Sequence, residues 1–358
     1  MGKTKICLIG INFSNGGADK IHAVMSNYFF SQGFEVHNVI FNDLITYEFS
    51  GKLINLGKIE AGSFRKFFIL KKFISDNNFD FIVDFRNRNN QWKEFLITKF
   101  LYTKPYIITV HSYQTSWYFP ENKWLSQNIF KKAYAIVTVS KLIEAKVREK
   151  YGYQNVTTIY NMLETQAIER KLQQHFEVDF KYILAVGRMV LDNNKQFNLL
   201  IESYAKSMLP QKNIKLLFLG DGPQKPALIS LAKQLNVEDQ IVFEGFVDNP
   251  FIYMKNATFT TLTSKNEGLP NIIMESLACG TPVISFDCKS GPSELIFNEE
   301  NGLLVEDQNF KKLVEAMNRM IDDEKLHEKC KANAKSSVAR FSPEIIGKQW
   351  ISLLQSKP

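Results

Sequence analysis

The sequence lacks the long apolar segments that identify membrane-spanning proteins. It has no run of about eighteen consecutive apolar residues, and the apolar part of residues 3–10 is too short for a signal peptide. The rest of the composition is that of an ordinary globular chain, with 45% hydrophobic residues in a length of 358. That length is enough for two domains with separate cores. We therefore expect a globular protein of the cytoplasm.

Groups that could ligate a metal ion are scarce and scattered. The four cysteines, Cys7, Cys279, Cys288 and Cys330, do not have the spacing of a metal site, and we expect reduced thiols that lie mostly in the core. The sequence contains no Asp-x-Asp pair and no cluster of histidine and cysteine. We therefore expect no metal ion and no other cofactor.

The sequence also lacks the Gly-x-Gly-x-x-Gly fingerprint of dinucleotide-binding folds. Residues 10–19, which follow the first expected strand, retain only the adjacent Gly16 and Gly17 at the start of a helix. Two glycines there allow the backbone to come close to a phosphate or to an acceptor sugar. A plain turn explains the same pair equally well.

The excess of positive charge is confined to one half of the chain. Residues 1–175 contain 23 Lys and Arg against 14 Asp and Glu, out of 44 against 37 overall, so the remainder holds 21 against 23. Within this half, residues 64–73 interleave phenylalanine with cations at helical spacing. A core helix with a charged outer face has this pattern, and so does a helix that lies on an anionic membrane. Nucleic acid is another anionic partner, but no recognised binding module is present.

Short apolar stretches alternate with amphipathic ones along the whole chain, which is typical of parallel sheets covered by helices. In the first half we expect strands at residues 5–10, 35–41, 79–85, 106–110, 135–139 and 155–160, and helices at residues 18–32, 64–77, 91–102, 123–132 and 141–151. In the second half we expect strands at residues 182–186, 215–219, 241–243, 259–262, 282–286 and 302–305, and helices at residues 196–207, 225–235, 251–255 and 269–277.

This alternation predicts an α/β protein with two Rossmann-like, doubly wound domains that face each other across a cleft. We place the first domain at residues 1–163 and the second at residues 181–340, joined by a polar hinge at residues 164–180. A last helix follows within residues 341–358. Ligands of parallel sheets bind beyond the carboxyl ends of the strands, so we expect the chemistry to lie in the cleft.

The stretch from Glu267 to Glu275 follows an expected strand of the second domain. We expect Pro270 in the first turn of the next helix, where its missing N–H costs no hydrogen bond. The free N–H groups of residues 268–271 then form an anion site, and the two glutamates can each accept a pair of hydroxyl groups. This arrangement suits a sugar nucleotide. The alternative interpretation of the same pattern is a surface helix with two solvated glutamates that have no function.

Other polar residues also lie at strand ends. Arg188 follows Gly187 after the first strand of the second domain, and Lys195 opens the next helix. If the two side chains converge at this strand end, their guanidinium and ammonium groups suit the two phosphates of a diphosphate. In the first domain, His111 ends the strand at residues 106–110, where we expect it to contact the substrate.

The chain contains, in this order, Gly16-Gly17-Ala18-Asp19, His111, Gly187-Arg188 with Lys195, Gly220-Asp221-Gly222-Pro223 and Glu267-Gly268-Leu269-Pro270-Asn271 through Glu275. With this ordered set of motifs it resembles the retaining GT-B glycosyltransferases that carry the E-x7-E signature. The resemblance spans nearly the whole length. It implies glycosyl transfer with retention of anomeric configuration, a donor bound to the second domain and an acceptor bound to the first. It also implies that the last helix crosses back to the first domain.

The same resemblance implies a role for each site residue. Arg188 and Lys195, beside Gly187, hold the donor diphosphate, and His111 lies near the reacting face of the sugar. Glu267 contacts hydroxyl groups of the transferred sugar, and Glu275 contacts the nucleotide ribose. The remaining donor contacts come from the start of the helix and from the first glycine loop, at Gly268, Leu269, Pro270, Asn271, Gly16 and Gly17. The chain departs from many relatives at Asp19, where they have glutamate, and at Met162, where they have proline.

We therefore predict a retaining, metal-independent glycosyltransferase that moves a hexose or N-acetylhexosamine from a nucleotide-diphosphate sugar, with UDP as the nucleotide. Its expected acceptor is a glycan or a lipid-linked sugar in the assembly of cell-surface polysaccharide. We expect it in the cytoplasm at the inner face of the cell membrane, with its basic domain on anionic lipid and without a nucleic-acid partner. The alternatives are a sugar-nucleotide epimerase of the same architecture, which needs no acceptor, and a basic nucleic-acid-binding protein.

Overall fold

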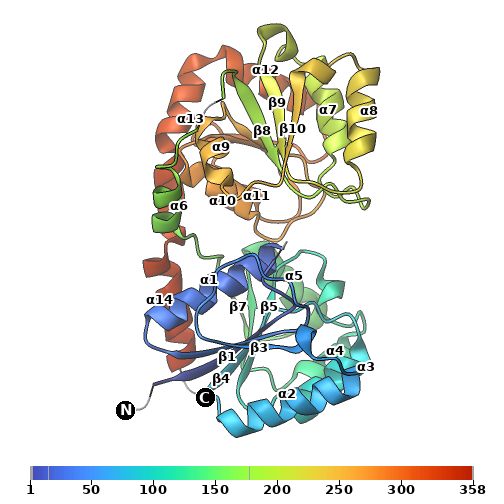
Figure 1. Cartoon of the computed structure of the whole chain (residues 1–358), viewed down its shortest axis with the longest axis vertical. Coiled ribbons are helices and arrows are strands. Elements are labelled where there is room, and N and C mark those ends of the chain that lie inside the picture. The colour runs from blue at the N-terminus through green and yellow to red at the C-terminus, as the bar shows by residue number, and fades with distance from the viewer. Residues whose placement is uncertain (1–2, 15, 177, 357–358) are drawn as a thin grey trace. The chain divides into compact units, whose positions relative to one another are not determined.

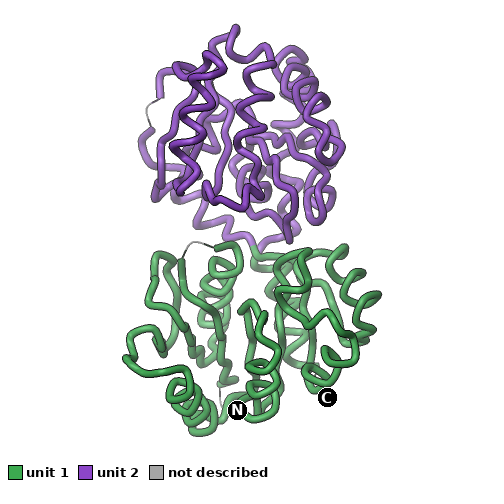
Figure 2. Tube along the Cα trace, turned by 90° about the vertical axis from the view of Figure 1, so that its right-hand side faces the viewer, with its two compact units in different colours: residues 1–162, 343–358 green, residues 163–342 purple. Residues whose placement is uncertain are grey.

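The computed structural model describes residues 3–14, 16–176 and 178–356. The chain divides into two compact units, coloured differently in Figure 2. The first contains residues 1–162 and 343–358, and the second contains residues 163–342. Each unit has its own parallel sheet and its own covering helices.

The first unit is a seven-stranded parallel sheet in the order β3-β2-β1-β4-β5-β6-β7 (Figure 1). Its strands are β1 (Lys5–Gly10), β2 (Glu35–Ile40), β3 (Lys52–Asn55), β4 (Phe81–Asp84), β5 (Tyr106–Val110), β6 (Ala135–Thr138) and β7 (Val156–Thr158). Its helices are α1 (Gly17–Ser31), α2 (Ser63–Asn77), α3 (Gln91–Leu96), the π-helical turn η2 (Ile97–Leu101), α4 (Lys123–Phe130), α5 (Lys141–Tyr151) and α14 (Pro343–Gln355). The central strands β4, β5 and β6 are buried along their whole length because helices cover both faces of such a sheet.

The last helix of the chain, α14, belongs to the first unit and packs against α1. The ring of Trp350 meets the ring of Phe29 edge-on, with 6.4 Å between centroids. Gly347 lies so close to Tyr28 that a Cβ atom there would come within 2.2 Å of the tyrosine hydroxyl. The hydroxyl of Tyr134 donates a hydrogen bond of 2.9 Å to the carbonyl of Leu353. The C-terminal segment therefore completes the fold of the N-terminal unit.

The second unit is a six-stranded parallel sheet in the order β10-β9-β8-β11-β12-β13. Its strands are β8 (Tyr182–Val186), β9 (Lys215–Leu219), β10 (Ile241–Gly245), β11 (Thr260–Leu262), β12 (Val283–Phe286) and β13 (Gly302–Val305). Its helices are α6 (Thr165–Lys171), α7 (Phe197–Lys206), α8 (Lys225–Gln234), α9 (Pro250–Asn256), α10 (Asn271–Ala278), α11 (Pro292–Leu295), α12 (Phe310–Asp322) and α13 (Glu324–Ser337).

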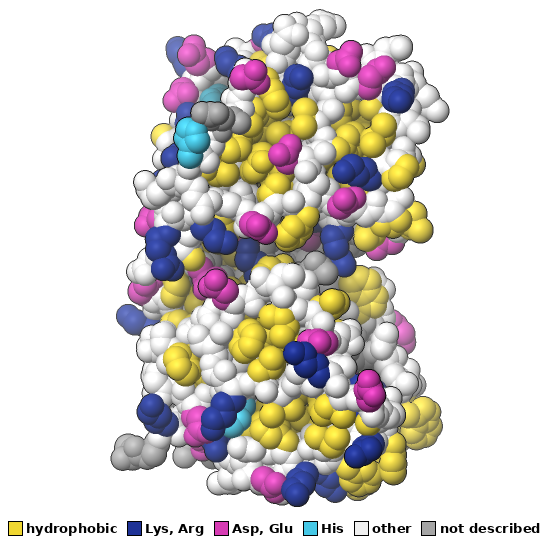
Figure 3. Space-filling view, in the orientation of Figure 1, with side chains coloured by type: hydrophobic (Ala, Val, Ile, Leu, Met, Phe, Trp, Pro, Cys, Tyr) yellow, Lys and Arg dark blue, Asp and Glu magenta, His cyan; other side chains and the backbone are white. Residues whose placement is uncertain are grey.

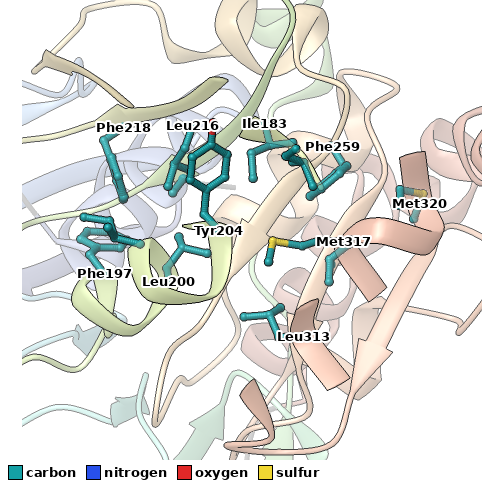
Figure 4. Packing of buried hydrophobic residues seen from close by; sticks show 14 of the residues in the cluster. Ile183, Phe197, Leu200, Tyr204, Leu216, Phe218, Phe259, Leu313, Met317 and Met320 are labelled. Carbon is teal, nitrogen blue, oxygen red and sulfur yellow. The ribbon is translucent and has the colours of Figure 1, made fainter. Parts of the chain in front are cut away.

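Figure 4 shows how the core of the second unit joins its sheet to two helices. Side chains from α7 and α12 interdigitate with side chains from the strands, and all are almost fully buried. The labelled members are Ile183, Phe197, Leu200, Tyr204, Leu216, Phe218, Phe259, Leu313, Met317 and Met320. Burial of such large apolar groups is the main source of stability for the unit.

The structure differs from the sequence-based expectation in several elements. β3 was not expected, because its residues are exposed or half-buried at the edge of the sheet and carry little apolar signal. The helix expected at residues 91–102 changes from α-helix to a π-helical turn at Ile97–Leu101. The polar segment expected as a hinge contains α6, which buries Ile168.

All four cysteines are free and buried, as expected. Within the part of the chain that the structure describes, no helix has both the length and the apolar character needed to cross a membrane.

Candidate functional site

Each sheet reverses its strand order at one place, between β8 and β11 in the second unit and between β1 and β4 in the first. The loops that leave the carboxyl ends of these neighbouring strands run to opposite faces of the sheet, which opens a crevice where ligands of doubly wound folds bind. In the second unit these loops carry Arg188, Lys195 and Glu267. In the first unit they carry Gly16 and Gly17 after β1, with His111 after the adjacent β5.

An ion pair joins the two loops of the second unit at its reversal point. The Nζ atom of Lys195 lies 2.7 Å from Oε1 of Glu267, and the two side chains are 23% and 15% exposed. This partial burial means that the pair is shielded from much of the solvent, so its electrostatic effect on a ligand exceeds that of a surface pair. The sequence did not indicate that these two residues contact each other.

Backbone and side-chain hydrogen bonds hold the two loops at this separation. The hydroxyl of Thr263 donates to the carbonyl of Lys195 at 2.7 Å. The amide of Lys265 donates to the carbonyl of Asn194 at 2.8 Å, and the side-chain amide of Asn194 donates to the carbonyl of Asn266 at 3.0 Å. These hydrogen bonds fix the two loops relative to each other, so Lys195 and Glu267 are already in position before a ligand binds.

The backbone at Gly187 is enclosed on two sides. A Cβ atom at Gly187 would come within 3.3 Å of both Cε of Lys195 and the ring of Phe197. Gly220 has a φ of +122°, and a Cβ atom there would come within 2.1 Å of the carbonyl oxygen of Gly187. Glycine is therefore required at position 220, and the end of β8 is fixed. Arg188 next to it is exposed, and no hydrogen bond or ion pair within the described ranges holds its guanidinium.

The start of α10 differs from the sequence-based expectation. The helix begins at Asn271, and Pro270 is its N-cap with an extended ψ of 103°, whereas we expected Pro270 inside the first turn. Behind this start, the hydroxyl of Ser290 donates to the carbonyl of Gly268 at 2.9 Å. Gly291 has a φ of +102°, and a Cβ atom there would come within 2.7 Å of the same carbonyl oxygen. The backbone that leads into α10 is thus tightly packed.

The two glutamates of this stretch occupy different environments. Glu275 is the fifth residue of α10 and is buried, with 8% of its surface exposed. Glu267 lies in the loop before the helix and forms the ion pair with Lys195. Asn271 and Glu275 are separated along the helix axis by about 6 Å at 1.5 Å per residue. The pattern that appears symmetric in the sequence therefore gives two carboxylates in different environments.

In the first unit, His111 lies directly after β5 in a chain of hydrogen bonds. Its Nε2 atom lies 2.9 Å from the hydroxyl oxygen of Thr109. That hydroxyl donates to the carbonyl of Asp84 at 3.0 Å, so its oxygen is left to accept, and Nε2 of His111 carries the proton. Burial, and then the charge of Arg88, lower the pKa of His111 to about 3. The imidazole is therefore neutral at physiological pH and has an acceptor at Nδ1.

Arg88 and Asp84 form a buried support beside His111 that the sequence analysis missed. The Arg88 guanidinium donates to the carbonyl of Thr109 at 2.6 Å and to the carbonyl of Asp84 at 3.2 Å. Arg86 also pairs with the Asp84 carboxylate, at 2.7 Å. These cations hold the pKa of the buried Asp84 carboxyl below its usual range against the effect of burial. The sequence did contain one signal for this cluster, an aspartate at the end of an apolar strand. A buried carboxylate at such a position needs cations or hydrogen-bond donors as partners.

The two glycines after β1 have a carboxylate next to them. Gly16 is the N-cap of α1, and Gly17 is the first residue of the helix. A Cβ atom at Gly16 would come within 2.6 Å of Oδ2 of Asp19, which lies in the first turn. This negative charge at the positive end of the helix competes with a phosphate but leaves an acceptor for hydroxyl groups.

Across the described residues, no group of three or more histidine, cysteine, aspartate and glutamate side chains is arranged to hold a metal ion. Burial raises the pKa of the Cys288 thiol, which lies near Glu267 and Lys195, and this favours the protonated thiol.

Two family models match the chain in sequence. The model for "Glycosyltransferase Family 4" matches residues 16–167, and the model for "Glycosyl transferases group 1" matches residues 167–337. A relative from Campylobacter jejuni, an N-acetylgalactosamine-N,N'-diacetylbacillosaminyl-diphospho-undecaprenol 4-alpha-N-acetylgalactosaminyltransferase, is 30% identical over 98% of this chain and 99% of its own length. The poly(ribitol-phosphate) alpha-N-acetylglucosaminyltransferase of Staphylococcus aureus is 23% identical over 65% of this chain and 46% of its own length.

Solved structures show the same fold. A glycosyltransferase from Rickettsia africae superposes with a TM-score of 0.81 at 18% identity and covers the whole of both chains. An Anabaena protein in complex with UDP-glucose superposes with a TM-score of 0.79 at 18% identity, over 99% of this chain and 100% of its own. Together with the two Rossmann-like parallel sheets of this protein, these matches confirm the predicted GT-B fold.

The sequence matches confirm the predicted family as well. The chain belongs to the group 1 glycosyltransferases and is an enzyme of glycosyl transfer.

Proposed function

We propose that the protein is a retaining glycosyltransferase that needs no metal ion and moves a hexose or N-acetylhexosamine from a UDP-linked sugar to a lipid-linked or glycan acceptor. The second unit binds the donor through Gly187, Arg188, Lys195, Glu267, residues 268–271 and Glu275. The first unit binds the acceptor and contributes His111. The product is an intermediate of cell-surface glycan assembly, made at the inner face of the cell membrane.

The observation that carries this proposal is the 2.7 Å pair of Lys195 and Glu267 at the strand reversal of the second unit. A nucleotide-diphosphate sugar has a negatively charged diphosphate next to a sugar with several hydroxyl groups. An ammonium and a carboxylate in contact match the junction of these two parts, because the ammonium binds phosphate oxygens and the carboxylate accepts hydroxyl protons. The bond that breaks in glycosyl transfer lies at that junction.

The comparisons support the choice of donor and acceptor. The Campylobacter jejuni relative is named for transfer of N-acetylgalactosamine to a diphospho-undecaprenol-linked sugar. The Anabaena protein is in complex with UDP-glucose, and a solved form of a Staphylococcus aureus protein contains UDP. A UDP-linked hexose or N-acetylhexosamine and a lipid-linked acceptor are therefore the first substrates to test.

Catalysis in this proposal is electrostatic and positional. Arg188 and Lys195 stabilise the charge that develops on the departing diphosphate, and the free N–H groups at the start of α10 add to this effect. Two cations and a helix start can carry this charge without a metal ion. The neutral His111 accepts a hydrogen bond at Nδ1 from a sugar hydroxyl. Retention of configuration follows from the resemblance to retaining GT-B enzymes.

Asp19 favours an acceptor over a phosphate at the Gly16–Gly17 loop. Its carboxylate is adjacent to Gly16, and a phosphate at the same place would be repelled by it. A hydroxyl of the acceptor can donate to that carboxylate while the glycine leaves room for the sugar ring. We therefore propose the acceptor as the ligand of this loop, in place of the donor contacts of Gly16 and Gly17 that the resemblance implies.

A panel of nucleotides and sugar nucleotides tests the donor assignment. A ligand at about a hundred times its dissociation constant stabilises the folded protein by about 2.7 kcal/mol, so we expect a rise in melting temperature with UDP and UDP-sugars and not with adenine nucleotides. Incubation of the stabilising UDP-sugar with and without a lipid-linked acceptor then identifies the reaction. Transfer that requires the acceptor supports the proposal. Isomerisation of the donor without an acceptor would instead identify an epimerase.

A further inference from the structure

Large apolar side chains are exposed on two neighbouring helices of the first unit. Trp92 is 81% exposed and Phe64 is 78% exposed, and Phe68, Leu96 and Phe100 are 50%, 48% and 45% exposed. Phe64 and Phe68 are four residues apart on α2, and Trp92, Leu96 and Phe100 follow each other at intervals of four along α3 and η2. Residues at this spacing lie on the same side of a helix. Each helix therefore has an outward apolar stripe in addition to its core-facing side.

The two stripes lie on adjoining elements. α3 continues directly into η2, and α2 packs against η2. Figure 1 shows α2 and α3 side by side, and Figure 3 shows apolar side chains next to lysine and arginine over the same part of the surface. The inner side of α2 is occupied by Leu70 and Ile74, which are buried. We call the exposed surface of residues 63–75 and 91–104 the aromatic–basic face.

The charge of the aromatic–basic face is predominantly positive. Residues 63–75 and 91–104 contain seven cations, Arg65, Lys66, Lys71, Lys72, Lys93, Lys99 and Lys104. Their one carboxylate, Glu94, is buried and pairs with the guanidinium of Arg86 at 3.0 Å. The outward-facing charge is therefore predominantly positive, because the exposed carboxylate of Asp76 near the end of α2 stands against seven cations.

This combination matches an anionic lipid surface. Interfacial helices place aromatic and aliphatic side chains among the acyl chains while lysine and arginine contact anionic headgroups. Tryptophan is enriched at membrane interfaces. The centre of a protein–protein interface is instead depleted of lysine.

The face has a defined relation to the acceptor side of the unit. α2 and α3 follow parallel strands β3 and β4, so their first turns, with Phe64 and Trp92, lie towards the carboxyl ends of these strands. His111 and the Gly16–Gly17 loop follow the carboxyl ends of β5 and β1 in the same sheet. Contact through this face therefore places the acceptor side of the unit next to the bilayer.

We propose that the aromatic–basic face docks the first unit on an anionic membrane, which deepens the proposed function by naming the surface that reaches a membrane-borne acceptor. Phe64 and Trp92 insert below the headgroups, and the cations of α2 and α3 bind anionic headgroups. The inference rests on the proposed function only for the location of the acceptor, because docking itself requires neither donor nor acceptor.

Vesicle binding without any substrate tests the proposal. The complete protein is mixed with phosphatidylcholine vesicles that contain about 30% phosphatidylglycerol, and with pure phosphatidylcholine vesicles, in a flotation assay. We expect binding to the anionic vesicles, at least tenfold weaker binding to neutral ones, and a loss at high salt. The Phe64→Ser/Trp92→Ser variant should bind anionic vesicles at least tenfold more weakly. Equal binding by the variant and the wild type, or no binding by the wild type, would overturn the proposal.

The matched control is Phe246→Ser, which removes a phenylalanine of the second unit that is 71% exposed. It should bind vesicles like the wild type, and a loss equal to that of the double variant would contradict docking through the proposed face. Because Phe64 and Trp92 are exposed, their replacement should leave the melting temperature unchanged, which separates a binding defect from unfolding. A blue shift of tryptophan fluorescence on vesicle addition that persists in Trp92→Ser would also contradict insertion of this residue.

Two further measurements separate this inference from other occupants and from the proposed function. If the wild type is dimeric in solution and the double variant is monomeric, a second copy covers the face and the docking proposal is wrong. Transfer to a detergent-dispersed acceptor should be the same in the double variant and the wild type, whereas transfer to an acceptor in anionic vesicles should fall at least tenfold. Failure of all transfer in the wild type would reject the proposed function and leave the vesicle-binding result intact.

Discussion

The ammonium of Lys195 lies 2.7 Å from a carboxylate oxygen of Glu267, although 72 residues separate them in the sequence. The contact joins the loop after β8 to the loop after β11, at the place where the order of strands reverses. It puts a group that binds phosphate next to a group that binds sugar hydroxyls. The chemistry of a sugar diphosphate is thus matched by one pair of side chains.

The two glutamates should respond differently to replacement. Glu267→Ala removes the carboxylate that we propose to lie next to the reacting bond, so we expect kcat to fall by at least a hundredfold with a smaller change in the KM for donor. Glu275→Ala removes the buried carboxylate that we propose to contact the ribose, so we expect the KM to rise at least tenfold while kcat changes less. Steady-state kinetics with a varied UDP-sugar give both values. The same pattern in both variants would contradict the division of roles.

The hydrogen-bond chain at His111 predicts an effect of Thr109→Val. Valine keeps the shape of threonine but removes the hydroxyl that accepts from Nε2 of His111 and donates to the carbonyl of Asp84. We expect a mixture of imidazole tautomers, visible in the nitrogen chemical shifts of His111, and about a tenfold lower kcat, because orientation of the ring is lost. Thr98→Val is the control, since it removes a buried hydroxyl that donates to the carbonyl of Glu94 at 3.0 Å. An unchanged tautomer in Thr109→Val would refute the assignment.

Acid should destabilise the first unit through His22. Burial lowers the pKa of this histidine to about 3, against about 6.5 in the unfolded chain. Between these values the unfolded state binds one more proton at His22. The contribution of His22 to the free energy of unfolding is therefore fully present above pH 6.5 and is lost at about 1.4 kcal/mol per pH unit as the pH decreases towards 3.

The variant His22→Leu tests this dependence, because leucine keeps apolar packing against the rings of Phe13 and Phe85. Urea unfolding at a series of pH values should show a weaker loss of stability between pH 6.5 and pH 4 than in the wild type. His175→Leu replaces an exposed histidine of the second unit and should leave the pH dependence unchanged. An identical pH dependence in His22→Leu and the wild type would count against the role of His22.

Chelation should leave turnover unchanged. The proposed charge stabilisation comes from Arg188, Lys195 and the start of α10, which are all part of the chain. Protein treated with excess EDTA should transfer sugar at the rate of untreated protein, and added Mg²⁺ or Mn²⁺ should not increase it by more than about twofold. Loss of activity that Mn²⁺ restores would show that a metal ion is required.

The sequence predicted the strands best where apolar residues form an unbroken run. The bounds of β5, β8 and β13 agree with expectation at both ends, because strands covered on both faces have a continuous apolar sequence. β3 has only exposed or half-buried residues, so its place in the sheet depends on pairing with β2, which no local pattern reveals. The start of α10 was misplaced by two positions, because proline suits both an extended N-cap and a first helical turn.

For the candidate site, local patterns predicted which strand ends would carry polar residues but not which side chains would contact each other. The contact of Lys195 with Glu267 was not expected, and the convergence of Lys195 with the exposed Arg188 on a diphosphate stays a prediction. Asp84 and Arg88 were missed because a buried ion pair has no sequence period. The roles of His111, Glu267 and Glu275 remain predictions that rest on the resemblance to retaining GT-B enzymes.

The most direct test of the account is the turnover of the Arg188→Ala/Lys195→Ala double variant with a UDP-sugar and a lipid-linked acceptor. A Lys212→Ala variant serves as the control, because Lys212 forms a surface ion pair with Asp322 in the same unit at 2.5 Å. The account predicts wild-type turnover for Lys212→Ala and a loss of at least a thousandfold for the double variant, since both charges that stabilise the departing diphosphate are gone. Near-native turnover in a folded double variant would contradict it.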